Sequence, residues 1–272
     1  MDGARTVMLA RLRNELGRLE TGGGDHSLPK VALGHAEADA VLQGGLVRGA
    51  MHEIHAGDGR QNASATGFTL GLVQRLTANK GFVLWVRQDF AARDSGELSM
   101  RGFKELGFDP RTLVMVQARD AQTVLRVTAD ALACSALRAV VGEFWGETKA
   151  FDLAASRKLT LTAASSGVTA LMLRLNAPPR ASTAETRWVV RAAPSPPAPA
   201  WMGWGFPVFD AALARNRHGQ TGRWIMTWMS DEYLFREQAD SQPAIAAPSD
   251  RPVETPVVAA SAPGHERQRR AG

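Results

Sequence analysis

The chain has 272 residues, of which 44% are hydrophobic, and this length is enough for one main domain with a sizeable core. Its formal net charge of +5 is compatible with contact to DNA but does not establish it. Cys134 is the only cysteine, which excludes an internal disulfide framework, and no apolar run approaches the ~18 residues that a membrane span needs. We therefore expect a cytoplasmic protein, in which Cys134 is a buried structural residue within an apolar helical run.

Residues 5–20 predict an amphipathic helix, because Met8, Leu12, Leu16 and Leu19 recur at helical spacing. Three glycines follow at positions 22–24. A helix tethered in this way packs on its own domain or docks on a partner. We assign residues 1–27 to this helix and its linker, and residues 28–237 to the main domain.

The stretch 49–76 predicts a buried strand at 51–56, a polar loop with glycines, and a helix over 65–78. This order is typical of a phosphate-binding loop, which also needs a lysine near the helix start. No lysine occurs between Lys30 and Lys80, and Arg60 precedes the helix by several residues, where its planar head does not replace a lysine. The sequence therefore predicts a degenerate phosphate loop, whose positions are Gly57, Asp58, Gly59, Arg60, Ser64, Ala65 and Thr66.

The segment that leads into this loop resembles the entry to the phosphate loop in the RecA superfamily. The pattern combines paired glycines with a conserved order of aspartate, leucine and a Glu-Ile pair. The matching positions in this chain are Gly34, Asp39, Leu42, Gly44, Gly45, Leu46, Gly49, Glu53, Ile54 and Gly57. The resemblance implies an α/β fold of the RecA-like kind, with a three-layer core, a mostly parallel central sheet and an antiparallel C-terminal hairpin.

His52 and His55 in the predicted strand raise the question of a metal site. They are three residues apart, so their side chains face opposite sides of a regular strand, whereas the helical metalloprotease pattern needs a spacing of four. We expect no metal site and no cofactor.

Two further positions bear on ATP hydrolysis. In RecA-like ATPases an acidic residue after the second strand orients the attacking water, and here Asp89 is the nearest carboxylate; we interpret it as an ordinary loop residue. A magnesium-binding strand would end in aspartate, but Gly142 occupies that place in the strand predicted at 138–144, which follows a helix predicted at 121–137. Glu143 points to the other face of a regular strand, although a bulge could turn it back. These losses argue against an enzyme.

Residues 208–229 predict two strands joined by a turn with Gly219 and Gly222, although the helical periodicity of 210–215 favours a helix. In relatives of RecA a basic turn of this kind reaches the nucleotide of the neighbouring subunit. We therefore regard Arg215, Arg217 and Arg223 as candidate contacts for DNA or a partner, with solvated turn cations as the alternative.

Aromatic and tail residues complete the pattern. Five tryptophans, at positions 188, 201, 204, 224 and 228, predict core packing rather than a stacking platform for single-stranded DNA. Residues 238–272 are rich in Ala, Pro and Ser and predict a disordered tail, whose arginines at 267, 269 and 270 are suited to weak contact with nucleic acid.

Taken in order, the RecA-like entry, the missing lysine, the strand that ends in Gly142 and Glu143, and the arginine/glycine turn resemble the ImuA family of SOS-associated mutagenesis proteins. The resemblance implies an ATPase-inactive accessory factor in translesion synthesis. Its implied partners are an ImuB-type relative of Y-family polymerases, an error-prone polymerase subunit and, in one version, RecA, with weak DNA contact at the nucleoid. Two alternatives stay open: a regulator that acts only through protein binding, like a SulA-type division inhibitor, and an ATPase that uses Arg60, Thr66 and Glu143.

Overall fold

The computed structural model describes residues 28–78, 80–196 and 205–238. The chain divides into two units, Met1–Ala239 and Asp240–Gly272, and every described residue belongs to the first. The predicted N-terminal helix, Trp201, Trp204 and nearly all of the predicted tail lie outside the described residues. Within those ranges, none of the helices has the length and apolar character that crossing a lipid bilayer requires.

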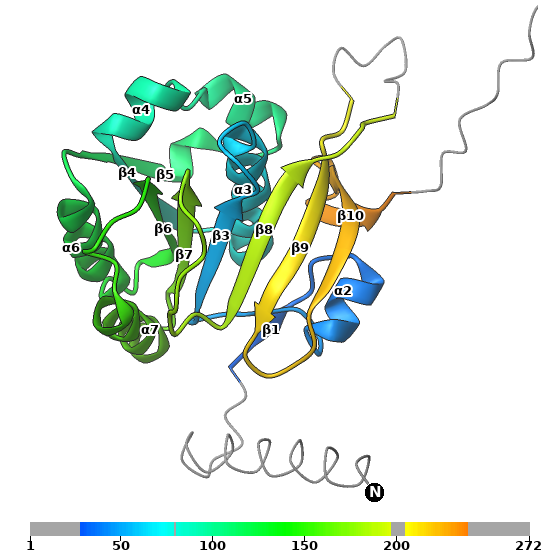
Figure 1. The fold of residues 1–272 in the computed structure, drawn as a ribbon. Coiled ribbons are helices and arrows are strands. Elements are labelled where there is room, and N and C mark those ends of the chain that lie inside the picture. The colour runs from blue at the N-terminus through cyan, green and yellow to red at the C-terminus, as the bar shows by residue number, and fades with distance from the viewer. Residues whose placement is uncertain (1–27, 79, 197–204, 239–272) are drawn as a thin grey trace, which may run out of the picture. The chain divides into compact units, whose positions relative to one another are not determined.

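A nine-stranded sheet forms the centre of the domain, in the order β11-β10-β9-β8-β3-β7-β6-β4-β5 (Figure 1). The strands from β5 to β8 pair in parallel, and those from β8 to β11 pair antiparallel. The bounds are β3 (Met51–Ala56), β4 (Phe82–Gln88), β5 (Leu113–Ala118), β6 (Leu137–Trp145), β7 (Thr169–Leu175), β8 (Thr186–Ala192), β9 (Val208–Asn216), β10 (Gly222–Met229) and β11 (Leu234–Glu237). The predicted α/β class, the mostly parallel sheet and the antiparallel C-terminal hairpin are confirmed.

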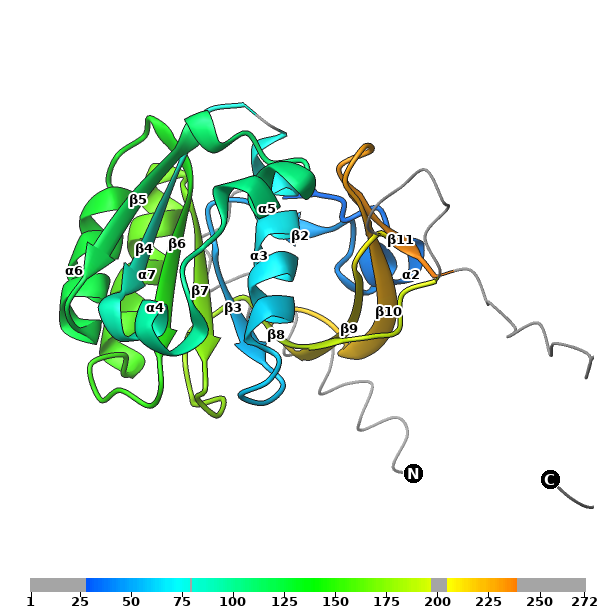
Figure 2. The same cartoon turned by 90° about the horizontal axis from the view of Figure 1, so that it is seen from above.

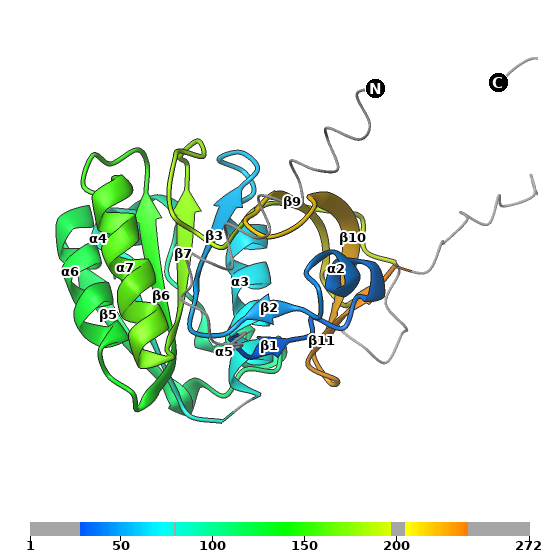
Figure 3. The ribbon, with the colours of Figure 1, turned by 90° about the horizontal axis from the view of Figure 1, so that it is seen from below.

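Helices cover the parallel part of the sheet on both faces. The core on one face lies under α3 (Asn62–Thr77) and α5 (Met100–Glu105), which are neighbours in Figure 2. On the other face α6 (Ala121–Leu132) and α7 (Leu153–Ser166) lie side by side (Figure 3). The remaining elements are α2 (Ala36–Val41), α4 (Asp89–Ser95), the 3₁₀ helix Pro110–Thr112, and a small antiparallel pair of β1 (Lys30–Val31) and β2 (Leu46–Val47).

Most helices begin at a side chain that caps the free backbone N–H groups of the first turn. Asp120 accepts a hydrogen bond from Thr123 N, and Asp152 accepts one from Ala155 N, both at 2.7 Å. Helix α3 begins differently, because the residue before it, Gln61, makes no side-chain cap. The position at which α3 starts is therefore set by the backbone of the preceding loop rather than by a capping side chain.

The tryptophans of the described C-terminal half lie in the core, as predicted. Trp188 and Trp228 are almost fully buried, and the rings of Phe68 on α3 and Trp188 on β8 have centroids 5.5 Å apart. Residues 208–216 form a strand rather than a helix, because Phe209, Ala211 and Leu213 alternate into this core. Packing against α3 thus overrides the local helical periodicity.

Four local predictions are wrong. Helix α3 begins three residues earlier than predicted, α6 ends at Leu132 rather than at 137, and Asp89 is the first residue of α4 rather than a loop residue. Cys134 is exposed rather than buried, because it lies in the turn that carries the chain from α6 to β6. The apolar run around it is interrupted where the chain leaves α6 and turns into the interior strand β6.

Candidate functional site

A crevice opens where β4 and β6 end side by side. The chain leaves β4 toward α5 on one face of the sheet and leaves β6 toward α7 on the other, and such a divergence is where α/β sheets commonly bind ligands. Arg87 on β4 and Glu143 on β6 are direct neighbours in the sheet at this point. The strand topology therefore places a cation and a carboxylate in the crevice.

Arg87 and Glu143 form a buried ion pair. Their side chains are each 1% exposed, and Arg87 Nη2 lies 3.0 Å from Glu143 Oε1. Trp85 Nε1 donates to the second carboxylate oxygen at 2.8 Å, and Arg87 Nη1 donates to Gly96 O at 3.1 Å. Burial raises the pKa of Glu143, while the Arg87 guanidinium and the Trp85 N–H oppose that rise. Both oxygens of Glu143 are thus engaged within the protein.

The position of Gly142 agrees with the alternation predicted from the sequence. A Cβ atom at Gly142 would meet Met172 and Thr128, on the α6 face of the sheet. Glu143 faces the opposite side, toward Trp85 and Arg87. The strand is regular here, and Glu143 lies two residues before the end of β6.

The predicted phosphate loop is closed by its own hydrogen bonds. Arg60 N donates to the Asp58 carboxylate at 2.8 Å, Gln61 N donates to Asp58 O at 3.0 Å, and Gly57 N donates to Val190 O at 2.8 Å. A phosphate cradle needs backbone N–H groups that point freely inward. Here three of them already have acceptors in the protein, and one of those acceptors is a carboxylate.

Ser64, Ala65 and Thr66 lie inside α3 rather than in the loop. Ala65 is completely buried in the core, so a lysine at this position would enter apolar packing instead of reaching a phosphate. Thr66 faces the cavity described next.

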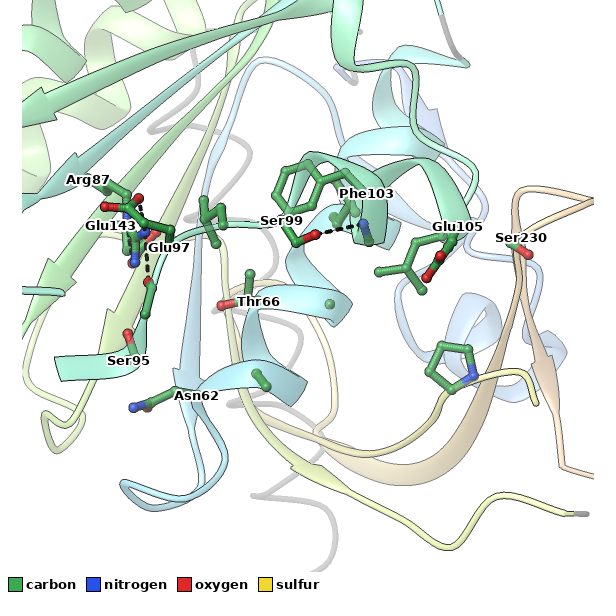
Figure 4. A pocket seen from close by; sticks show the side chains of 18 of the residues that line it. Asn62, Thr66, Arg87, Ser95, Glu97, Ser99, Phe103, Glu105, Glu143 and Ser230 are labelled. Carbon is green, nitrogen blue, oxygen red and sulfur yellow. Dashed lines mark hydrogen bonds and ion pairs between the residues drawn. The ribbon is translucent and has the colours of Figure 1, made fainter. Parts of the chain in front are cut away.

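A cavity of about 810 Å³ lies between α3, the segment 94–106 and the segment 205–207. Figure 4 shows Arg87 and Glu143 together at one end of it, and Glu105 and Ser230 at the other. Of the residues predicted for a site, the cavity brings together Gly59, Thr66 and Glu143. Asp89 does not line it, and neither do the other positions predicted for the loop and the magnesium-binding strand, which are Gly57, Asp58, Arg60, Ser64, Ala65 and Gly142. The candidate arginines Arg215, Arg217 and Arg223 do not line it either.

The charge of the cavity lining is negative. Asp94, Glu97 and Glu105 line it as exposed carboxylates, with the Glu97 side chain 72% exposed. Among the described lining residues Arg87 is the only cation, and Glu143 already neutralises it. A nucleotide triphosphate would meet like charge here rather than a counter-ion.

The candidate arginines lie at the end of the sheet opposite to the predicted phosphate loop. Because β9 runs antiparallel to β8, the turn after β9 lies at the end of the sheet away from the loop 57–61 (Figure 1). Arg215 belongs to β9 rather than to the turn, and its guanidinium donates to Ser182 O at 2.5 Å. Arg223 pairs with Asp210 at 2.5 Å, whereas exposed Arg217 has no ion pair among the described residues.

Comparison with known proteins identifies the family. No family model matches the chain. Two curated relatives do, each named Protein ImuA and each from a strain of Caulobacter vibrioides; they are 32% identical over 213 residues, which cover 73% of this chain and 83% of the relative. The chain belongs to the ImuA family. The resemblance drawn from the motifs is thereby confirmed.

In this ImuA-family chain the two histidines of β3 have structural surroundings. His52 lies between the Thr186 hydroxyl and Val47 O, at 2.8 Å from each, and burial lowers its pKa to about 4. His55 Nδ1 lies 3.3 Å from Ala177 O, and its Nε2 lies 3.6 Å from the Glu53 carboxylate. Within the described ranges, no group of three metal-binding side chains occurs.

Sequence reasoning missed Arg87 as the partner of Glu143 in this ImuA-family protein. The signal was present, because Val83, Trp85 and Arg87 alternate onto one face of β4, and the first two are completely buried. A cation on such a face needs a buried carboxylate. The lining carboxylates Asp94, Glu97 and Glu105, which form the acidic wall of the cavity, gave no comparable signal. The sequence does not show that their segment folds over the crevice.

Proposed function

We propose that this protein is a non-catalytic accessory factor in DNA-damage-induced mutagenesis. Its place in the ImuA family supports the mutagenesis role. In this proposal the nucleotide-binding architecture is kept for its surfaces, which bind an ImuB-type relative of Y-family polymerases, an error-prone polymerase subunit and, in some assemblies, RecA. Its site of action is the nucleoid within the cytoplasm.

The observation that carries the non-catalytic part is the closed loop after β3. Its N–H groups at Gly57, Arg60 and Gln61 are bonded within the protein, and Asp58 places negative charge where phosphate would sit. The acidic lining of the neighbouring cavity acts in the same direction. Electrostatics and hydrogen bonding thus both disfavour a bound triphosphate.

We expect no saturable binding of a fluorescent ATP analogue with magnesium to the purified protein at concentrations up to 1 mM, roughly the upper limit of cellular affinities. The physical reason is that three N–H groups of the loop already have acceptors, that no lysine lies between Lys30 and Lys80, and that Arg87, the cation lining the neighbouring cavity among the described residues, is paired with Glu143. Equilibrium anisotropy measures this, with a P-loop ATPase as the positive control. Binding in the micromolar range that Thr66→Ala weakens would instead support the ATPase alternative.

DNA contact is proposed at the β9–β10 turn. We expect weak, salt-dependent binding of a single-stranded oligonucleotide. We expect Arg217→Ala to weaken it and to lower the slope of log K against log salt by about 0.7, as loss of one phosphate contact on a single strand does. Arg217 is chosen because it is exposed, while Arg215 and Arg223 have partners within the protein.

The matched control for this experiment is Arg101→Ala, another exposed arginine, on α5. It should leave the affinity and the slope unchanged. An equal effect of both substitutions would mean that the turn has no specific role. Binding with no salt dependence would favour the alternative of a regulator that contacts only proteins.

A further inference from the structure

The cavity beside the buried ion pair has mostly apolar walls. Leu70, Leu98, Phe103, Leu106 and Phe206 contribute to its lining. Its volume of about 810 Å³ falls within the range of roughly 300–1,000 Å³ that is usual for ligand sites. Apolar surface in a cavity of this size is stabilised when apolar groups of a ligand displace water from it.

One residue that lines this cavity has a buried hydrogen-bond acceptor without a partner in the described part of the chain. Asn62, in the first turn of α3, lines the cavity and is 9% exposed, and its Oδ1 has no hydrogen-bond partner among the described residues. A buried amide oxygen that lacks a donor is destabilising, so a ligand N–H group that reaches it would remove that cost. The site therefore favours a ligand with donors rather than one with phosphate oxygens.

The charges at the edge of the cavity also select the ligand. Asp94 is an exposed carboxylate. Glu97 is exposed and lies 3.6 Å from Arg87 Nη1, and Glu105 is exposed and forms a surface ion pair with Arg101, which contributes little to stability. The only lining cation among the described residues is the neutralised Arg87. A cationic group beside an apolar anchor would complement this arrangement, and an anionic group would be repelled.

We propose that this cavity is the docking site for a short segment of a partner protein, in which apolar side chains are flanked by arginine or lysine. The apolar side chains enter between α3 and α5, and a backbone or side-chain N–H of the segment donates to Asn62 Oδ1. The flanking cations meet Asp94, Glu97 and Glu105. This inference rests on the proposed function, because it names the place at which an accessory protein of this kind receives its partner.

Gly102 offers a way to block the cavity without damaging the fold. It lies in α5 and lines the cavity, and a Cβ atom there would meet nothing closer than Ser99 Cβ at 3.5 Å. Gly102→Leu should therefore fill part of the cavity, and it should keep or raise the stability, because leucine is a better helix former than glycine. Ala63→Trp, at an exposed lining position of α3, is a second blocking variant.

The test is selection of a phage-displayed library of random twelve-residue peptides on the purified full chain, with counter-selection on Gly102→Leu. We expect clones that combine apolar residues with Arg or Lys, and we expect both blocking variants to lower their affinity by about tenfold or more, which corresponds to loss of a buried anchor. The double variant Asp94→Asn, Glu105→Gln should weaken them severalfold and reduce their salt dependence. Thermal unfolding checks that each variant is folded.

Three results would overturn the inference. One is recovery of no clone that distinguishes the natural chain from Gly102→Leu, and another is that the discriminating clones are acidic. The third is displacement of the clones by millimolar magnesium ATP, which would make the cavity a nucleotide site. Failure of the proposed function is seen separately, in the direct nucleotide-binding measurement, so the two proposals can fail independently.

Discussion

Replacing Arg87 by leucine is expected to lower the free energy of unfolding by about 3–5 kcal/mol, because it leaves the buried Glu143 carboxylate without its counter-ion. The Trp85 N–H alone then stabilises the charge. Denaturant unfolding followed by tryptophan fluorescence measures the change. The double variant Arg87→Leu, Glu143→Leu should recover most of the loss, since it removes the charge together with its partner.

The loss should also depend on pH. Burial raises the pKa of Glu143 in the folded protein, and removing Arg87 takes away the main opposing influence. A carboxyl whose pKa is raised on folding stabilises the fold below its unfolded pKa of about 4.5, and this stabilisation is lost as the pH rises. The cost of Arg87→Leu should therefore be smaller at pH 5 than at pH 8.

A matched surface control is Arg101→Leu, which removes the exposed ion pair to Glu105. It should change the free energy of unfolding by less than about 1 kcal/mol. If Arg87→Leu proved equally mild and independent of pH, the buried pair would not be the stabilising element of the crevice. The position of the segment at Gly96, whose carbonyl accepts a hydrogen bond from Arg87, would then have to depend on other contacts.

Acidification is expected to destabilise the protein through His52. Its pKa falls from 6.5 to about 4 on folding, mainly because burial disfavours the charged ring, against the hydrogen bond to Val47. A histidine whose folded pKa is depressed stabilises the fold fully above its unfolded pKa of 6.5, and it loses that contribution as the pH falls toward 4. The total is about 3 kcal/mol.

The hydrogen bonds explain why the ring stays neutral. The Thr186 hydroxyl accepts from Trp188 Nε1 and can donate to His52 Nδ1, while His52 Nε2 can donate to Val47 O. A protonated ring would present a second N–H to the Thr186 hydroxyl, whose own proton would then have no acceptor. The chain from Trp188 to Val47 thus needs the neutral tautomer with the proton on Nε2.

The measurement is the free energy of unfolding of the natural chain and of His52→Gln between pH 4 and pH 8. The variant should be less stable at pH 8, but its stability should fall less steeply on acidification, because it has no ring to protonate. Parallel pH profiles for the two proteins would mean that folding does not shift the pKa of His52, and would contradict the prediction. The other acid-sensitive groups act on both proteins and cancel in the difference.

The two predictions concern two pairs of neighbouring strands in the parallel part of the sheet. The Arg87–Glu143 pair joins β4 to β6 at the sheet end that borders the cavity, and the His52 chain joins β3 to β8 at the opposite end of the sheet. In the proposed function both act as fixed supports for the binding surfaces.

The sequence by itself determined the class of the fold and most of its strands. Regular alternation and apolar runs located β3 at 51–56 and the strands that follow. The absence of a lysine between Lys30 and Lys80 predicts that the loop after β3 is a degenerate phosphate loop. The motif order also indicated the ImuA family, which the relatives confirm. These features are local, so neighbouring residues carry their signal.

Only the tertiary structure decided what surrounds Glu143. Its partner Arg87 lies 56 residues earlier, and the acidic wall of the cavity comes from a segment that folds over the strand ends. The same holds for Cys134, whose exposure follows from where the chain turns, and for Arg215 and Arg223, whose partners lie on other strands or loops. The spacing of residues along the chain reveals the periodicity of a single helix or strand. A crevice forms where elements that are distant in sequence meet. Its charge and shape therefore depend on tertiary packing, which no single stretch of sequence encodes.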